Sequence, residues 1–292
     1  MKSYSDYLSK IFPGIKVQKI SIDAGFTCPN RDGTLSTGGC IYCRNDSFSP
    51  GYCNPSLSIK RQLEEGKRFF SRKYPDMKYL AYFQSYTGTY NKNAEELREM
   101  YLEALREDGV VGLIVATRPD CLPDATLRLL ADINKNYKPV FIEIGAESSH
   151  DNTLKLINRN HSWEDVEKTV RKIAESGIHC GLHLILGLPG EDKDMIYETI
   201  RKTALLPIET LKLHQLQVLK DTPLFYMMKA NELQIPEFSL NEYLELCAGI
   251  VKMIPENIVI ERFLSQSPPE MVVSPSWGLK NYEFMTKLAK LL

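Results

Sequence analysis

Six short apolar segments alternate with segments of helical periodicity, and this alternation constrains the fold more than any other feature of the chain. The strand-like segments are 16–23, 78–84, 110–116, 139–144, 179–186 and 211–218. Segment 110–116 (VVGLIVA) is nearly all apolar, as expected of a strand covered on both faces. Strands that alternate with helices predict parallel βαβ units. Right-handed crossovers wind such units into an open sheet or a partial barrel, with the chemistry at the carboxyl ends of the strands.

Helical periodicity and end signals place helices between these strands. The expected helices cover 58–70, 94–107, 124–133, 162–177, 193–205, 239–254 and 281–292, and 258–263 is expected to form a seventh strand. Asn93 has the spacing from Glu96, and Ser239 from Glu242, that begins a capped helix. Basic residues between 60 and 73 offer a local patch for nucleic acid. The solvated face of an amphipathic helix explains them more simply.

The composition is that of a soluble globular protein, with 43% hydrophobic and 25% charged residues. No apolar run is long enough to span a bilayer and the start is not a signal peptide, so a cytoplasmic protein without membrane contact is expected. Seven cysteines, an odd number, favour reduced thiols over a disulfide framework. The formal net charge of −1 argues against binding nucleic acid through broad electrostatics.

A long loop after the first strand, residues 24–55, contains Cys28, Cys40 and Cys43 at spacing C-x11-C-x2-C. Three interpretations compete. A closed structural zinc site needs four ligands, and Cys53 is available as the fourth. The C-x2-C pair alone would suit redox chemistry. A 4Fe–4S cluster held by three thiolates leaves one iron open to another ligand.

The cysteine loop and four later motifs resemble the radical S-adenosylmethionine (SAM) superfamily. The segment DAGFTCPNRDGTLSTGGCIYC, residues 23–43, is similar to the YhcC-like proteins of the branch that includes the Elongator catalytic subunit. The later motifs are TRPDCLPD (117–124), IEIGAES (142–148), GLHLILGLPGE (181–191) and HQLQVLKDTPL (214–224). The resemblance implies an α/β fold whose core, residues 1–220, is a partial (β/α)6 parallel-strand barrel. Residues 221–292 would form a C-terminal extension that packs on the barrel mouth.

The same resemblance implies the cofactors and the chemistry. Cys28, Cys40 and Cys43 would be the catalytic metal ligands of a 4Fe–4S cluster, and the open iron would bind SAM. Reductive cleavage of SAM there yields methionine and a 5′-deoxyadenosyl radical, which removes a hydrogen atom from the substrate. The electron would come from an external one-electron reductant of the flavodoxin or ferredoxin type.

Residues that follow the later strands are candidate SAM contacts. Gln84 and Ser85 follow the second strand, where much of the family has a Gly-Gly-Glu stretch, and a plain polar turn is the alternative. Glu147 and Ser148 follow the fourth strand and are expected to accept the ribose hydroxyls. Gly187, Pro189 and Gly190 resemble the adenine-side motif, and a tight strand-to-helix turn explains them equally.

Candidate substrate contacts are Arg118, His183, His214, Arg262 and Trp277. Histidines inside strands are more often satisfied core residues than ligands. Trp277 suits stacking on a splayed base, with anchoring of the last helix as the alternative. Glu143 would be costly in its apolar strand without a partner, and Arg118 is the expected partner. Cys121, Cys180 and Cys247 fit buried apolar positions.

The resemblance to the Elongator branch suggests a tRNA-modifying enzyme, of lyase or transferase type, that acts on the side chain of the wobble uridine. Two alternatives remain open at this point. One is a radical SAM enzyme that acts on a small metabolite or a protein, and the other is a non-catalytic zinc-binding module. The sequence leaves the substrate, the fate of SAM, the role of Cys53 and the oligomeric state open.

Overall fold

The chain folds around one curved sheet of seven parallel strands in the order β1-β2-β3-β4-β5-β6-β8. The computed structural model describes residues 2–72 and 76–292, so Lys73, the last of the basic residues noted above, lies outside the described residues. The strands are β1 (Val17–Ile22), β2 (Lys78–Phe83), β3 (Val110–Thr117), β4 (Val140–Glu147), β5 (His179–Leu186), β6 (Thr210–Gln215) and β8 (Val259–Arg262). This is the partial barrel that was expected, with the seventh strand added at the β6 edge.

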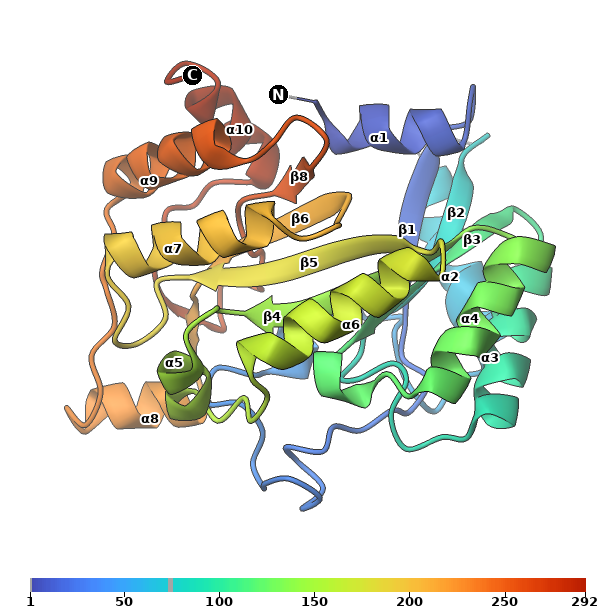
Figure 1. The fold of residues 1–292 in the computed structure, drawn as a ribbon, viewed down its shortest axis with the longest axis horizontal. Helices are drawn as coiled ribbons and strands as arrows, with labels where there is room; N and C mark the ends of the chain where they lie inside the picture. Colours follow the sequence, from blue (N-terminus) through green and yellow to red (C-terminus); the bar gives the residue numbers. More distant parts are fainter. Residues whose placement is uncertain (1, 73–75) are drawn as a thin grey trace.

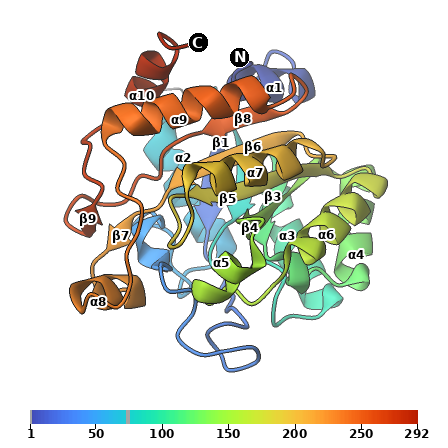
Figure 2. The same ribbon diagram turned by 60° about the vertical axis from the view of Figure 1, so that its left-hand side comes forward.

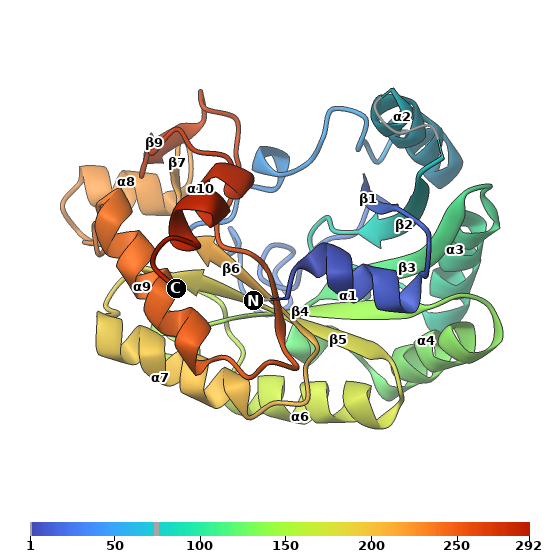
Figure 3. The same cartoon turned by 90° about the horizontal axis from the view of Figure 1, so that it is seen from above.

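Helices cover the outer side of the curved sheet, as Figure 3 shows. The expected helices are present as α2 (Ile59–Ser71), α3 (Ala94–Arg106), α4 (Asp124–Asn136), α6 (Trp163–Glu175), α7 (Lys193–Ala204), α9 (Leu240–Met253) and α10 (Asn281–Leu288). Asn93 with Glu96 and Ser239 with Glu242 form the capping boxes that begin α3 and α9. In the described part of the chain, no helix combines the length and apolar character needed to cross a membrane.

Several elements have no counterpart among the expected ones. They are α1 (Tyr4–Ile11), α5 (Asp151–Leu156) and the short antiparallel pair β7 (Val218–Leu219) with β9 (Val272–Ser274). Helix α8 (Pro223–Lys229) lies in 223–236, a stretch whose sequence is typical of a connection with one short element. The sixth strand was expected to continue to residue 218, but β6 ends at Gln215 and the chain turns into β7. Figure 2 shows α8 beside β7 and β9, at the end of the molecule away from α1.

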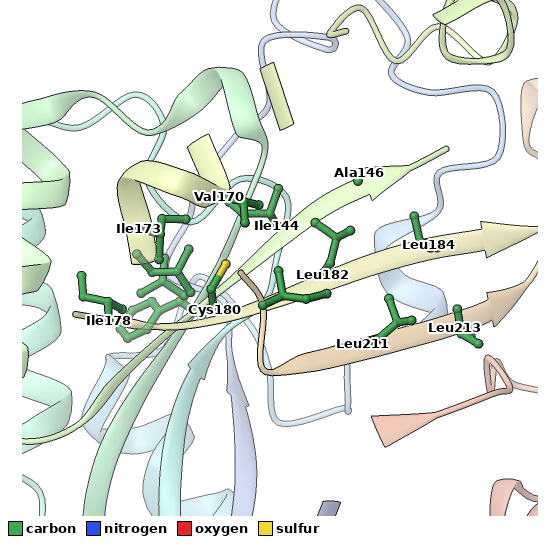
Figure 4. Packing of buried hydrophobic residues seen from close by; sticks show 14 of the residues in the cluster. Ile144, Ala146, Val170, Ile173, Ile178, Cys180, Leu182, Leu184, Leu211 and Leu213 are labelled. Atoms are coloured by element: carbon green, nitrogen blue, oxygen red, sulfur yellow. The ribbon is translucent and has the colours of Figure 1, made fainter. Parts of the chain in front are cut away.

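Alternate residues of each strand divide between the two sides of the sheet because side chains in a strand have a period of two. Leu182 and Leu184 of β5 and Leu211 and Leu213 of β6 belong to the main core beneath the covering helices, with Val170 of α6 (Figure 4). All five side chains are fully buried. Each such side chain contributes about 1.5–3 kcal/mol by leaving water.

The concave side of the sheet carries an apolar layer at the amino ends of the strands. There α1 closes the barrel, and its Tyr7 and Leu8 pack with Leu80 of β2, Ile114 of β3 and Phe141 of β4. Above this layer the inward side chains become polar. The polar upper part of the barrel is where the candidate site lies.

Candidate active site

A cavity of about 240 Å³ opens at the carboxyl ends of the strands. It is lined by residues of β2, β3, β4, β5, β6 and β8, and by the loop after β1, which is the blue loop at the lower edge of Figure 1. The strand-end residues meet here because the strands are parallel, so that all their carboxyl ends lie at the same rim of the barrel.

Cys28, Cys40 and Cys43 all line this cavity, so the loop brings the three thiols of the C-x11-C-x2-C pattern to one place. Cys28 and Cys40 are buried, and Cys43 is partly exposed. Burial and the neighbouring Cys40 raise the pKa of Cys43 to about 12. Among the described residues, no group of three or more His, Cys, Asp or Glu side chains is arranged to hold a metal ion.

The cysteine loop is fixed to the segment between α5 and α6. The Asn30 amide donates hydrogen bonds to the carbonyl oxygens of Asn158 and Arg159, at 2.6 and 3.0 Å. The Asn158 amide donates back to the Gly39 carbonyl at 2.8 Å. Gly39 has φ 84°, and a Cβ there would lie 2.8 Å from the Arg31 guanidinium, so only glycine fits the turn before Cys40.

The sulfur of Cys40 accepts hydrogen bonds from two side chains, one in the cysteine loop and one in the segment between α5 and α6. Asn30 Nδ2 lies 3.5 Å and Arg159 Nη1 lies 3.8 Å from the Cys40 sulfur. Donors aimed at a ligand sulfur stabilise its thiolate form and tune a bound metal cluster. The surroundings of Cys40 are therefore suited to a metal-bound thiolate.

Glu147, the last residue of β4, faces the cavity in an unusual backbone conformation, with φ 66°. It pairs with Arg159 at 3.3 Å, and Arg159 also donates to the Gly145 carbonyl at 2.6 Å. A Cβ at Gly145 would lie 2.6 Å from Arg159 Nη2 and 2.8 Å from Glu147 Oε1. Burial raises the pKa of Glu147, although Arg159 opposes the shift.

Arg118, directly after β3, is 1% exposed and also lines the cavity. Its guanidinium pairs with Asp120 at 2.7 Å, but its Nη1 has no hydrogen-bond partner. The buried hydroxyl of Thr87, on the same wall, has none either. Buried polar atoms without partners are costly in a folded protein and are a usual feature of sites that receive a ligand.

The floor of the cavity is an ion network centred on Glu143. Its carboxylate contacts Lys19 at 2.9 Å, Lys212 at 2.6 Å and His183 at 2.9 Å. The Tyr82 hydroxyl donates to it at 2.5 Å. Burial alone would raise the pKa of Glu143, but Lys19 and Lys212 outweigh it and hold that pKa well below its usual range. The expected pairing of Glu143 with Arg118 is therefore wrong.

The reason lies in the strand register. Glu143 stands beside Ala116 of β3, and Arg118 lies two residues further on, above the rim of the sheet. The floor also joins the two edges of the open barrel, because Lys19 of β1 reaches Glu261 of β8 at 2.7 Å. Two lysines and two glutamates balance one another in this floor.

His183 and His214 lie next to each other above the floor, with ring centroids 5.6 Å apart, and both line the cavity. Burial and the Lys212 charge lower the pKa of His183 to about 4. Burial and the Arg262 charge hold the pKa of His214 well below its usual range. Both imidazoles are thus neutral near pH 7.

The remaining candidates divide into two groups. Gln84 and Arg262 line the cavity with the residues already described. The others, found outside the cavity lining in the described structure, are Ser85, Ser148, Gly187, Pro189, Gly190 and Trp277. The Ser148 hydroxyl bonds to Glu191, Gly187 lies against Phe238, and Trp277 packs on Tyr243 at 4.9 Å between ring centroids.

Sequence reasoning missed several residues of the site. They include Tyr42, which lines the cavity, and Arg159, Lys19 and Lys212. Lys19 and Lys212 left a signal, since each lies inside an expected strand beside an apolar residue and would need a carboxylate partner if the strand is buried. Arg159 left none, because it lies in a connection between helices that nothing in the local pattern relates to the cysteine loop.

Two family models match the chain. Residues 30–203, more than half of it, match the model described as the Radical SAM superfamily. Residues 208–292 match the Radical_SAM C-terminal domain.

Relatives of known sequence cover nearly the whole chain. It is 36% identical to YtqA of Bacillus subtilis over 279 residues, which covers 96% of this chain and 85% of YtqA. It is 33% identical to YhcC of Escherichia coli over 279 residues, covering 96% of this chain and 88% of YhcC. The similarity to the YhcC-like proteins inferred from the cysteine loop is confirmed.

A more distant similarity covers part of the chain. The tRNA uridine(34) acetyltransferase of Methanocaldococcus infernus is 25% identical over 185 residues, 61% of this chain and 33% of that protein. Among solved structures, the Elp3 protein of the same archaeon, lacking its N-terminus, superimposes with a TM-score of 0.66 at 18% identity, over 94% of this chain and 62% of that one.

Proposed function

Because the chain belongs to the radical SAM superfamily, we propose that Cys28, Cys40 and Cys43 hold the 4Fe–4S cluster, with SAM bound beside it in the same cavity. The cluster and SAM are the cofactors of this family. The convergence of three thiols in one cavity carries the proposal. Three thiolates suit a cluster and leave one iron for another ligand.

The residues around the cysteines fit these cofactors. Arg118 Nη1 and Thr87 Oγ1 are buried donors without a protein partner, and a carboxylate such as that of SAM would satisfy the arginine. Glu147, held by Arg159, presents carboxylate oxygens to the cavity and suits hydroxyl groups of a ribose. When bound, the cofactors supply a 5′-deoxyadenosyl radical that removes a hydrogen atom from the substrate.

The protein side of this chemistry is to bind, orient and exclude water. The loop that carries the cysteines covers one side of the cavity, and the ion network of Glu143 closes its floor. His183 donates its Nε2 proton to Glu143, which leaves Nδ1 as a hydrogen-bond acceptor. An external one-electron reductant of the flavodoxin or ferredoxin type would supply the electron, consistent with a cytoplasmic location.

For the substrate, we propose the side chain of a wobble uridine in tRNA. Two similarities support this choice: the partial match to the tRNA uridine(34) acetyltransferase of M. infernus and the shared fold with Elp3. The chemistry of the cavity supports it as well, because Arg31 and Arg262 line it and have no carboxylate partner among the described residues, which suits an anionic substrate. Arg44, Arg118 and Arg159 also line the cavity, but each is paired with a carboxylate.

The test combines a cell experiment with an enzyme assay. Nucleosides of total tRNA are compared between a strain lacking the gene and the same strain complemented with it. We expect a wobble uridine derivative to disappear in the deletion strain and return on complementation. A complementing copy carrying Cys43→Ala should not restore it, whereas one carrying Cys247→Ala should, because Cys247 is a buried core residue.

An unchanged nucleoside profile would remove the tRNA proposal. The anaerobically reconstituted protein is then assayed for 5′-deoxyadenosine with SAM and a strong reductant. Formation of 5′-deoxyadenosine without any change in tRNA would assign the enzyme to a small metabolite or a protein substrate. Failure to take up iron and sulfide would contradict the cofactor assignment itself.

A further inference from the structure

Arg262 at the end of β8 is partly buried, and it differs from the buried Arg118 and Arg159 of the same cavity because the described residues give it no carboxylate partner. Arg118 pairs with Asp120 and Arg159 pairs with Glu147. For Arg262, the described residues offer a single hydrogen bond, from Nη2 to His214 Nε2 at 3.4 Å, and its buried Nε has no partner. A guanidinium in such surroundings is strongly stabilised by an anion.

The nearby carboxylates cannot serve as that anion. Glu143 is already bonded to Lys19 and Lys212, and Glu261 is bonded to Lys19 at 2.7 Å. Lys212 lies 3.5 Å from Glu261, so the four charges form a closed and neutral set. The positive charge of Arg262 therefore remains uncompensated at the cavity wall.

We propose that Arg262 and the hydroxyl of Ser265 form a subsite that binds an oxyanion of the substrate, either a phosphate or a carboxylate. The inference rests on the proposed function only in placing the substrate within this cavity. A planar guanidinium offers two parallel N–H donors, which match both kinds of oxyanion. The radical chemistry of the family does not require such a subsite, so it bears on substrate choice.

The direction of the hydrogen bonds leaves Ser265 free to donate. Arginine can only donate, so His214 Nε2 accepts from Arg262. The neutral ring then carries its proton on Nδ1, which donates to Ser265 Oγ at 2.9 Å. The hydroxyl proton of Ser265 has no acceptor among these groups and can point into the cavity, which Ser265 lines.

A further donor lines the same cavity. Gln217 accepts a hydrogen bond from the Ser267 hydroxyl through Oε1 at 2.8 Å, so its NH₂ group remains available. Arg262, Ser265 and Gln217 all line the cavity, on the side formed by β8 and the chain that follows β6. These three side chains give the cavity wall donors that suit an oxyanion.

The test measures binding without turnover. The reconstituted protein is saturated with SAM, without reductant, so that Arg118 and the cofactor site are covered. Inorganic phosphate, acetate, uridine and uridine 5′-monophosphate are then titrated at constant ionic strength, with calorimetry and the thermal unfolding midpoint as readouts. We expect saturable binding of at least one anionic probe, weakened at least tenfold by Arg262→Gln and less by Arg262→Lys.

Arg98→Gln is the matched control, because Arg98 lies on α3, is paired with Asp132 and does not line the cavity. It should bind every probe as the wild type does, and cluster content and circular dichroism should be equal in all variants. Phosphate also stabilises proteins by exclusion from their surface, so only the difference between wild type and Arg262→Gln counts.

The probes separate the two sources of the anion. Tighter binding of uridine 5′-monophosphate than of uridine, with the difference lost in Arg262→Gln, identifies a phosphate. Binding of acetate but not phosphate identifies a carboxylate. Equal affinity of wild type and Arg262→Gln for every anionic probe overturns the subsite. The binding assay measures no turnover, so its result is independent of the tRNA experiment. If the anion binds at Arg262 but the deletion strain shows unchanged tRNA, the tRNA proposal is wrong and the subsite stands.

Discussion

At the scale of single residues, the site depends on thiols that differ only in their place in the fold. Cys28, Cys40 and Cys43 line the cavity, whereas Cys180 and Cys247 lie in the main core. Cys53 lies in the same loop as the first three but outside the cavity lining, in the part of the chain that the structure describes. Substitution of each cysteine in turn will therefore show how many thiolates bind the metal cluster.

Alanine at Cys28, Cys40 or Cys43 should each abolish the visible absorption of the reconstituted protein, because a cluster with one iron already open does not survive the loss of a thiolate. Alanine at Cys53 or Cys247 should leave that absorption and the iron content near the wild-type values. Absorption spectra and iron analysis after anaerobic reconstitution measure both. Loss of absorption with Cys53→Ala would instead indicate four thiolate ligands.

Gly145 is a second residue whose effect can be stated in advance. Alanine there would press on Arg159 and Glu147, because its Cβ would lie 2.6 Å and 2.8 Å from their polar atoms. We expect Gly145→Ala to destabilise the protein by about 1–3 kcal/mol, as overpacking does, and to weaken SAM binding. Urea unfolding and equilibrium dialysis measure these effects. Gly51→Ala is the control, since a Cβ there meets nothing within 4 Å.

At the scale of elements, the barrel is closed at its amino end by α1 rather than by a side-chain layer of the strands alone. Leu8 of α1 packs with apolar residues of β2, β3 and β4, and α1 also lies against β8. Above this layer, Lys19 of β1 and Glu261 of β8 join the two edges of the sheet. The N-terminal helix and the last strand thus stabilise the floor on which the cavity rests.

Leu8→Ala should therefore destabilise the fold by about 2–3 kcal/mol, within the range for removing a buried leucine side chain. Its neighbour Ser9 is exposed, and Ser9→Ala should change the stability by less than about 0.5 kcal/mol. Chemical denaturation of both variants measures the difference. Equal stability of Leu8→Ala and Ser9→Ala would show that α1 is dispensable for closing the barrel.

At the scale of the whole molecule, neutral histidines make the folded state sensitive to acid. Burial lowers the pKa of His161 to about 3 and that of His183 to about 4, and holds that of His214 well below its usual range. An unfolded chain takes up these protons near pH 6.5, whereas the folded chain does not until the pH is far lower. The unfolded state then binds more protons, so stability falls as the pH falls.

The free energy of unfolding should accordingly decrease as the pH is lowered from about 6.5 to about 4. His183→Gln keeps a donor to Glu143 but cannot be protonated, so its curve should be flatter than that of the wild type. The contribution of His183 over this range is on the order of 3 kcal/mol. Urea unfolding at several pH values compares the two proteins, and parallel curves would contradict a neutral buried His183.

The sequence by itself determined the parallel α/β architecture, because strand and helix periodicities are local properties that each segment carries. It also identified the cysteine loop and most strand-end residues, since parallel pairing brings every strand end to one rim. Only the tertiary structure decided that Glu143 pairs with Lys19 and Lys212 rather than with Arg118. Such pairings depend on strand register and on the meeting of the two sheet edges.

Only the tertiary structure decided the contacts of site residues that lie outside the central strands or at their ends. Arg159 reaches Cys40 and Glu147 because the cysteine loop docks on residues 157–160, a contact between segments more than a hundred positions apart. Arg262 is left without a carboxylate because the neighbouring acids are satisfied by lysines of other strands. Charge balance of this kind is a property of the folded interior, where partners are set by distance in space and not by distance along the chain.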